Sequence, residues 1–177
     1  MNLEELDKQY VLQTYARDYT NFVKGVGSTL YDDQGRDYID FASGIAVNSV
    51  GHNHPKLVEA ICDQAKSIIH ISNLQVIEPQ AKLAQKIVEL SGFDMGLFFA
   101  NSGAEANEGA IKIARKYGET KFENKRYKVI TLEHSFHGRT ITTVKATGQE
   151  SFHTPHFSPY PDGFTYEKSI EDVYHAI

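Results

Sequence analysis

The sequence predicts an α/β fold built around a parallel sheet, because three consecutive segments alternate between strand and helix patterns. Residues 95–100 form a short, continuous apolar run, which is typical of a strand that is covered on both faces. Residues 103–117 have the apolar periodicity of a helix, and residues 127–132 form a second strand-like run. The inner face of that helix is expected to carry Ile111, Ala114 and Tyr117. A strand, a helix and a strand in this order indicate a right-handed parallel crossover.

The amino-terminal part is expected to contain a short helix followed by a β-hairpin. Residues 3–15 mix apolar and charged side chains in a helical pattern. Two β-rich stretches, residues 28–31 and 37–41, flank a turn that contains Asp and Gly. Strand-forming residues on both sides of such a turn are the sequence pattern of a hairpin.

Periodic apolar stripes predict two more helices ahead of the first strand. The first follows Pro55, and the second runs from Pro79 to Gly92. Their stripes consist of Leu57, Val58, Ile61, Ala65, Ile68 and Ile69 in the first helix, and of Leu83, Ala84, Ile87 and Val88 in the second. A last helix is expected over residues 168–177, after a segment (151–164) rich in Pro, His and aromatic residues. Two strands alone would leave a sheet edge and an apolar helix face exposed, so we expect the chain to be a fragment.

The composition excludes several classes of protein. The 177 residues are 41% hydrophobic and 23% charged, which is a globular balance. Lys and Arg number 18 against 23 Asp and Glu, and this net charge of −5 argues against a nucleic-acid partner. A single cysteine, Cys62, excludes a disulfide framework and a Cys-rich zinc site. The acidic start resembles no targeting signal, and no apolar run is long enough for a membrane span, so we expect a cytoplasmic protein.

The first candidate binding loop joins residues 95–100 to the following helix. Ser102 and Glu105 fit a capping box, which makes Ser102 the expected N-cap. Gly103 and Ala104 then fall in the first helical turn, where backbone N–H groups lack helical partners and small side chains let an anion approach. A well-capped helix without any ligand explains the same spacing and stays open as an alternative. The dinucleotide fingerprint and the P-loop motif are both missing.

The second candidate loop, residues 133–140, follows the second predicted strand. Open α/β sheets bind ligands at the carboxyl ends of their strands. Phe136 offers a stacking face there, a histidine of the same loop a proton-handling group and Arg139 a clamp for a carboxylate. The alternative is a surface loop whose aromatic ring packs against the protein. We expect both loops at the same edge of the sheet.

The histidine pairs and the serines give no motif of a metal site or a hydrolase. The pairs are His52 with His54, His134 with His137, and His153 with His156. None has the H-E-x-x-H arrangement of a helical zinc site, so we predict no metal site. The G-x-S-x-G elbow of serine hydrolases is also missing.

Five strings of residues together carry a family resemblance. They are DFASGIAVN at 40–48, GHNHP at 51–55, NSGAEANE at 101–108, KIARKY at 112–117 and SFHGRT at 135–140. This combination resembles the class III, pyridoxal-phosphate-dependent aminotransferases along essentially the whole chain, which would be less than half of a full member. ATGQ at 146–149 and FSPYP at 157–161 resemble the acetylornithine branch of that family, with the succinylornithine and ornithine branches as alternatives.

The resemblance implies a fold, a cofactor and four site residues. The fold would be the type I aminotransferase fold, with residues 1–55 in the small domain and residues 56–177 forming the first part of the large domain and its mixed, mostly parallel sheet. The cofactor would be pyridoxal 5′-phosphate, and the protein would be a homodimer with active sites at its interface. The implied roles are phosphate binding by Gly103 and Ala104, stacking on the pyridine ring by Phe136, and binding of the substrate α-carboxylate by Arg139.

The implied reaction moves the terminal amino group of N-acetylornithine to 2-oxoglutarate in arginine biosynthesis. Another omega-amino acid is the alternative substrate, and a noncatalytic phosphate-binding module or an interaction protein derived from an enzyme are alternatives of a different class. In the family the catalytic lysine and the acid at the pyridine nitrogen lie beyond residue 177, so no catalytic residue is assigned here and the isolated chain is expected to be inactive. Residues 15–19 lack the proline of a Tyr-x-Arg-x-Pro string that is frequent in the family, so Tyr15 is left out of the site.

Overall fold

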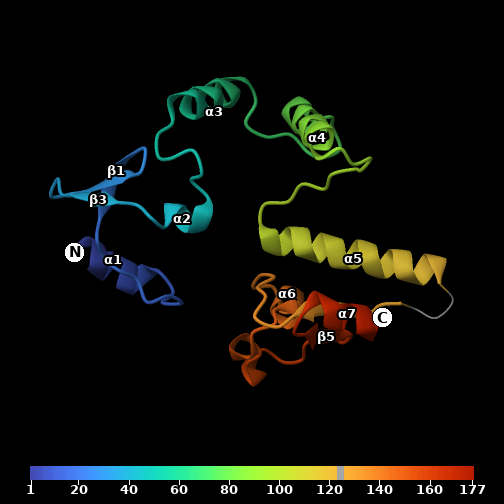
Figure 1. Ribbon diagram of the computed structural model, residues 1–177. Coiled ribbons are helices and arrows are strands. Elements are labelled where there is room, and N and C mark those ends of the chain that lie inside the picture. Colours follow the sequence, from blue (N-terminus) through green and yellow to red (C-terminus); the bar gives the residue numbers. More distant parts are fainter. Residues whose placement is uncertain (123–125) are drawn as a thin grey trace. The chain divides into compact units, whose positions relative to one another are not determined.

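The computed structural model describes residues 1–122 and 126–177, and these residues form two compact units. The first unit spans residues 1–77 and the second spans residues 78–177 (Figure 1). The expected division into domains after residue 55 concerns the complete protein and stays a prediction.

The first unit combines a small antiparallel sheet with three helices. Its elements are α1 (Leu3–Tyr10), β1 (Phe22–Val26), β2 (Thr29–Asp32), β3 (Asp37–Ile39), α2 (Ser43–Ala46) and α3 (Pro55–Ser67). The sheet order is β1-β2-β3, with Leu30 of β2 paired to Tyr38 of β3. The predicted hairpin is therefore confirmed, and β1 is an additional strand that the sequence patterns did not predict.

The hairpin turn is organised around the buried carboxylate of Asp32. Its oxygens accept hydrogen bonds from the backbone N–H groups of Gln34 (3.0 Å) and Arg36 (2.9 Å). They also accept from the guanidinium of Arg36 (2.6 Å) and the hydroxyl of Tyr38 (3.0 Å). Gly35 adopts a φ of +79°, which favours glycine, and completes the turn. One acidic side chain thus fixes the geometry that the sequence encoded with Asp and Gly.

The helices of the first unit differ from the prediction at their ends and in their burial. Helix α1 ends at Tyr10 instead of residue 15, because the side-chain amide of Gln13 donates to the carbonyls of Asp7 (3.0 Å) and Val11 (2.8 Å) at its carboxyl end. Helix α3 begins at Pro55 as predicted. Its apolar stripe is exposed, however, with Ile61 at 60%. The stripe expected to be a core face is an open surface within this unit.

The second unit contains one parallel strand pair and several helices. Its elements are α4 (Glu78–Ser91), α5 (Gly103–Lys121), β4 (Val129–Leu132), α6 (Ile141–Ala146), the short 3-10 helices η1 (Glu150–Phe152) and η2 (Pro155–Phe157), β5 (Phe164–Glu167) and α7 (Ile170–Ala176). Strands β4 and β5 pair in parallel, from Val129 opposite Phe164 to Leu132 opposite Glu167. The mixed α/β architecture with a parallel pair is the predicted fold class.

The predicted strand over residues 95–100 is wrong for the described part of the chain, where this segment belongs to no strand. A strand requires a neighbour for its backbone hydrogen bonds, and β4 takes β5 as its partner instead. The side chain of Phe98 packs on α5, where a Cβ added to Gly109 would lie 2.8 Å from its ring. The parallel crossover therefore leads from β4 through α6 to β5.

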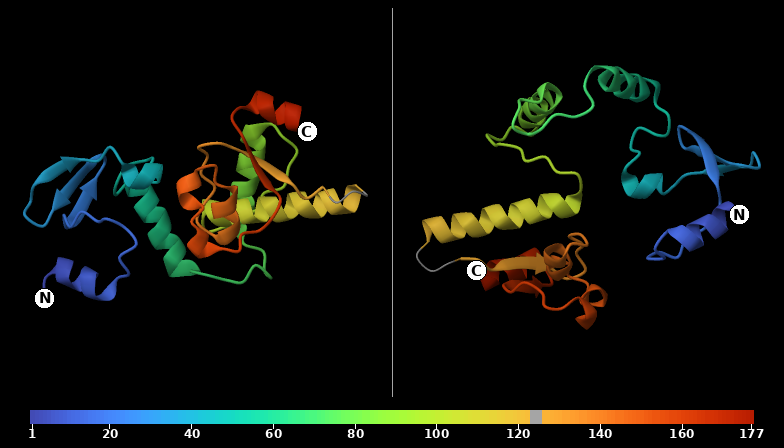
Figure 2. Two further views of the ribbon diagram at one scale, coloured as in Figure 1. Left: turned by 90° about the horizontal axis from the view of Figure 1, so that it is seen from below. Right: turned by 180° about the vertical axis from the view of Figure 1, so that it is seen from behind.

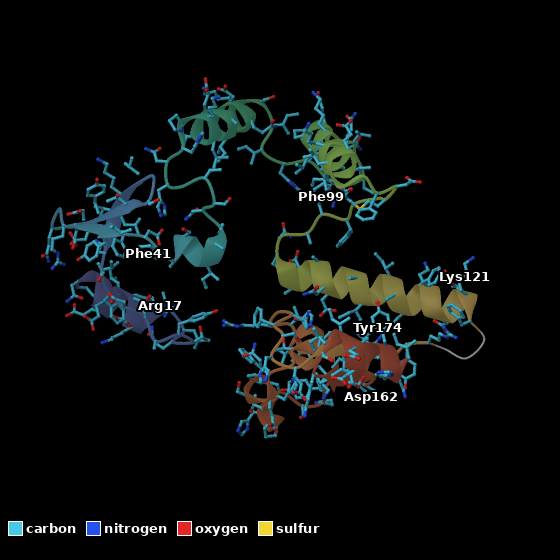
Figure 3. The ribbon with its side chains drawn as sticks, viewed as in Figure 1. Arg17, Phe41, Phe99, Lys121, Asp162 and Tyr174 are labelled. Carbon is cyan, nitrogen blue, oxygen red and sulfur yellow. The ribbon has the colours of Figure 1, made fainter. Side chains whose placement is uncertain are left out.

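The inner face of α5 is rotated from the predicted one. Ile111 is buried as expected, but Ala114 and Tyr117 are exposed. The guanidinium of Arg115 donates to the carbonyls of Tyr127 (3.1 Å) and Asp162 (2.8 Å), which turns the flank of the helix that carries Arg115 toward the later segments. Helix α5 ends at Lys121. Figure 3 labels Lys121 and also Asp162, whose carbonyl accepts the hydrogen bond from Arg115.

The buried core of the second unit lies between α5 and α6. Its apolar members are Ile111, Val144 and Ala146, and two threonines on and after α6, Thr143 and Thr147, are fully buried. Both views of Figure 2 place the segment that carries α6 beside α5, in agreement with the contacts between the two helices. In the described residues, no helix is both long and apolar enough to cross a membrane.

Candidate functional site

Helix α5 begins with the predicted N-cap. The hydroxyl of Ser102 accepts a hydrogen bond from the backbone N–H of Glu105 at 3.2 Å. The carboxylate of Glu105 accepts from the backbone N–H (2.8 Å) and the side-chain amide (3.0 Å) of Asn101. In a complete capping box the Glu105 carboxylate would accept from the backbone N–H of Ser102. Here it accepts from the backbone N–H of Asn101, one residue earlier. The result is a rigid turn directly before the first helical residues.

The backbone N–H groups of Gly103 and Ala104 are available to an anion. Within residues 1–122 and 126–177, neither group donates a hydrogen bond. A Cβ added to Gly103 would meet no atom within 4 Å, so the space in front of this turn is open. The helix has 19 residues, and its dipole favours negative charge at this end.

The second predicted loop, residues 133–140, follows β4 and leads into α6. The ring of Phe136 is 55% exposed and contacts the ring of Phe152 in an edge-to-face arrangement, with 5.9 Å between centroids. Phe136 is therefore only partly packed against the protein, in contrast to the alternative of a ring that is packed down completely. Arg139 lies exposed on the same loop.

The two loops meet, as expected, although not as two strand ends of one sheet. Gly138 has a φ of +130°, and a Cβ added to it would lie 2.6 Å from the Cβ of Ala104. The side-chain amide of Asn107 donates to the carbonyl of His137 at 2.8 Å. The hydroxyl of Thr140 donates to the carboxylate of Glu108 at 2.5 Å. The first two turns of α5, rather than a sheet edge, bring the loops together.

The buried threonines support the loop from its other side. The hydroxyl of Thr147 accepts from the backbone N–H of His137 at 3.0 Å and donates to the carbonyl of Thr143 at 2.9 Å. The backbone N–H of Gly148 donates to the hydroxyl of Ser135 at 3.2 Å. Asn107 and Thr147 were not predicted as functional residues, although both lie within strings that carry the family resemblance.

A cavity of about 610 Å³ opens beside the start of the loop. Its lining consists of Glu133, His134, Gly148, Gln149, Glu150, Ser151, His153 and Tyr166. The predicted site residues are not part of this lining. Across the described part of the chain, no three His, Cys, Asp or Glu side chains gather in a way that would hold a metal ion.

The four predicted site residues fit a phosphate monoester that carries an aromatic ring. Two unpaired backbone N–H groups face open space at the helix terminus, and an exposed aromatic side chain stands on the neighbouring loop. An arginine three residues beyond that aromatic side chain adds a planar donor of the kind that binds carboxylates in two parallel hydrogen bonds.

Comparison with known proteins gives a consistent family. A family model described as aminotransferase class III matches residues 13–175. The acetylornithine aminotransferase of Wolinella succinogenes is 65% identical over 98% of this chain, and that of Caldanaerobacter subterraneus is 53% identical over 97%. The chain spans 44% of the length of each of these two relatives.

Solved structures with the same fold are aminotransferases. The ornithine aminotransferase of Toxoplasma gondii is 30% identical, with a TM-score of 0.88 over 99% of this chain and 43% of that one. A taurine:2-oxoglutarate aminotransferase from Bifidobacterium kashiwanohense, solved with pyridoxal phosphate and glutamate, is 27% identical, with a TM-score of 0.84 over 99% and 40% of the two chains. The expected type I aminotransferase fold is thereby confirmed for this part of the protein. The chain belongs to the class III aminotransferases, a family whose cofactor is pyridoxal 5′-phosphate.

Proposed function

We propose that these residues are the amino-terminal part of an enzyme that moves the terminal amino group of N-acetylornithine to 2-oxoglutarate. The observation that carries this proposal is the 65% identity to a relative named acetylornithine aminotransferase, over 98% of the chain. The same reaction would place the protein in arginine biosynthesis, in the cytoplasm.

Gly103 and Ala104 would hold the cofactor phosphate through their backbone N–H groups. The open space at Gly103 and the positive end of the α5 dipole support this role. When bound, pyridoxal phosphate supplies an electron sink for the carbanion chemistry of amino-group transfer. The chain's own contribution here is retention and orientation, because backbone donors on a capped helix cannot rotate away.

Phe136 and Arg139 would orient the ring and the substrate. The Phe136 ring, which is exposed and also contacts the ring of Phe152, would stack on the pyridine ring. The guanidinium of Arg139 would bind the α-carboxylate of acetylornithine in a bidentate manner. Both side chains belong to the loop that a hydrogen bond from Asn107 ties to α5. This bond would fix the position of the proposed carboxylate site relative to the proposed phosphate site.

The catalytic lysine and the acid at the pyridine nitrogen would come from residues outside this chain. No lysine among the 177 residues is assigned that role, and we propose that the chain is inactive by itself. We further propose a homodimer, because the exposed apolar stripe of α3 offers a surface that a second copy would cover.

A related enzyme acting on ornithine is the second candidate, supported by the structural match to the Toxoplasma gondii ornithine aminotransferase. Steady-state kinetics of the full-length protein with 2-oxoglutarate distinguish the candidates. N-acetylornithine, N-succinylornithine and ornithine are compared as amino donors. The proposal predicts the highest kcat/KM for N-acetylornithine, and a higher kcat/KM for either other donor would overturn it.

A further inference from the structure

The backbone of His137 is held on two sides, through its N–H and through its carbonyl, by side chains from different parts of the second unit. On one side, the backbone N–H of His137 donates to the hydroxyl of fully buried Thr147 at 3.0 Å. On the other side, the carbonyl of His137 accepts from the side-chain amide of Asn107 at 2.8 Å. Thr147 belongs to the core behind the loop, whereas Asn107 belongs to the second turn of α5.

The loop approaches α5 too closely at this point to allow a side chain. Gly138 is buried, and a Cβ on it would overlap the side chains of Ala104 (2.6 Å) and Thr143 (2.8 Å). The contact with Ala104 lies directly at the proposed phosphate site. A shift of the backbone at His137 and Gly138 would therefore move the loop relative to the turn that carries Gly103 and Ala104.

We propose that Asn107 is a positioning residue that fixes loop 133–140 against the first turns of α5, a role that rests on the proposed function for its effect on catalysis. Its hydrogen bond to His137 lies between Phe136 and Arg139 along the loop. It therefore sets where the stacking ring and the carboxylate clamp stand relative to the phosphate donors. Asn107 itself touches neither the cofactor nor the substrate in this account.

The amide of Asn107 suits this role because its N–H group donates to the carbonyl of His137. Aspartate has nearly the same shape but offers only acceptor oxygens, which would repel the His137 carbonyl. Glutamine keeps the donor on a longer side chain. The pair Asn107→Asp and Asn107→Gln thus separates loss of the hydrogen bond from loss of shape.

Arg115→Ala provides a matched control from the same helix. The guanidinium of Arg115 also donates to main-chain carbonyls of later segments, those of Tyr127 and Asp162, but it does not contact loop 133–140. This substitution should lower the melting temperature without altering the substrate KM. It measures what loss of a structural clamp on α5 does by itself.

The test uses the full-length protein and three measurements: hydrogen exchange of peptides covering 133–140, circular dichroism in the absorption band of bound pyridoxal phosphate, and steady-state kinetics. Asn107→Asp should accelerate exchange in the loop, change the dichroism of the cofactor and raise the KM for N-acetylornithine by roughly tenfold or more, as expected when a partly buried hydrogen bond is replaced by a repulsive contact. Asn107→Gln should recover part of each change. Arg115→Ala should leave the dichroism and the KM at their wild-type values.

The exchange measurement needs no activity, so the positioning role and the proposed function can fail separately. A wild-type protein without transaminase activity, combined with faster loop exchange in Asn107→Asp, would reject the function and retain the anchoring of the loop. Unchanged loop exchange in Asn107→Asp would overturn the inference. The inference is also overturned if Asn107→Asp, like Arg115→Ala, lowers only the melting temperature.

Discussion

At the scale of single residues, Gly103 gives the sharpest separation between binding and folding. The space in front of its Cα is open, so a side chain placed there disturbs no neighbour within the chain. A substitution at this position should therefore affect binding of the cofactor phosphate rather than folding of the chain. The same reasoning applies less directly to Arg139, whose side chain is long enough to serve either the substrate or the protein.

Gly103→Asp should weaken cofactor retention by roughly 10- to 100-fold in the full-length enzyme, because its carboxylate would stand beside the phosphate and repel it. Gly103→Ala is the matched control, since its methyl group fits the same open space without charge. Cofactor content after dialysis is the measurement. Wild-type retention by Gly103→Asp would remove this turn from the phosphate site.

Arg139→Ala should raise the KM for N-acetylornithine, with a loss of about 2–5 kcal/mol of binding if the guanidinium pairs with a desolvated carboxylate. Arg139→Lys should restore little, because a point charge cannot reproduce the two parallel hydrogen bonds. Cofactor content and melting temperature should stay near wild type. An unchanged KM with a lowered melting temperature would instead assign Arg139 a structural role.

Asp32 makes the stability of the first unit depend on pH. Burial by itself would raise the pKa of Asp32, but the hydrogen bonds from Arg36, Tyr38 and the turn amides outweigh it and lower the pKa from 3.8 to about 2. A carboxyl group with a lowered pKa in the folded state stabilises the fold above its unfolded pKa. That contribution is lost as the pH falls from about 4 through about 2.

The prediction compares the wild type with Asp32→Asn in urea unfolding at a series of pH values. The wild type should be the more stable protein by a constant margin above about pH 4, and the margin should shrink toward pH 2. A margin that does not change over this interval would show that the carboxylate charge contributes nothing to the turn.

At the scale of elements, the sequence predicts local structure well where one residue specifies it. Ser102 caps α5, Pro55 opens α3 and the turn at Gly35 closes the hairpin, as the patterns indicate. The apolar run over 95–100 fails as a strand because strand formation depends on a distant partner, which local composition does not encode. Strand β5 was not predicted, because four residues after a Pro-rich segment are too few to show a clear periodicity.

Close packing between elements is likewise invisible to periodicity. A Cβ on Gly148 would overlap the backbone carbonyl of Leu132, so the chain after α6 can lie against the end of β4 only because this residue is glycine. Gly138 likewise lies so close to Ala104 that a Cβ on it would overlap the side chain of Ala104. The sequence contained the glycines, but only the structure identifies what they approach.

Gly148→Ala should accordingly destabilise the protein by about 1–3 kcal/mol, because the carbonyl it meets belongs to the backbone and cannot rotate away. Gly96→Ala is the control, since a Cβ at Gly96 meets no atom within 4 Å. Free energies of unfolding from urea titration check both. Equal stability of the two variants would contradict the packing described for β4 and the chain after α6.

At the scale of the whole molecule, we propose that the chain supplies one part of a catalytic site. It spans 44% of the length of the Wolinella succinogenes relative, and the residues proposed for the cofactor phosphate and the substrate carboxylate lie within that part. The exposed apolar stripe of α3 has the physical character of a surface that further protein covers. The capping pattern and the loop chemistry pointed to the four site residues, and the family resemblance gave them their roles, whereas the hydrogen bonds that support them required the structure.

The central claim is that the first turn of α5 and loop 133–140 form one site for pyridoxal phosphate. A crystal structure of the full-length protein with bound cofactor tests it most directly. The account predicts phosphate oxygens within hydrogen-bond distance of the backbone N–H groups of Gly103 and Ala104, with the Phe136 ring stacked on the pyridine ring. A phosphate group bound elsewhere, with this turn facing solvent, would contradict it.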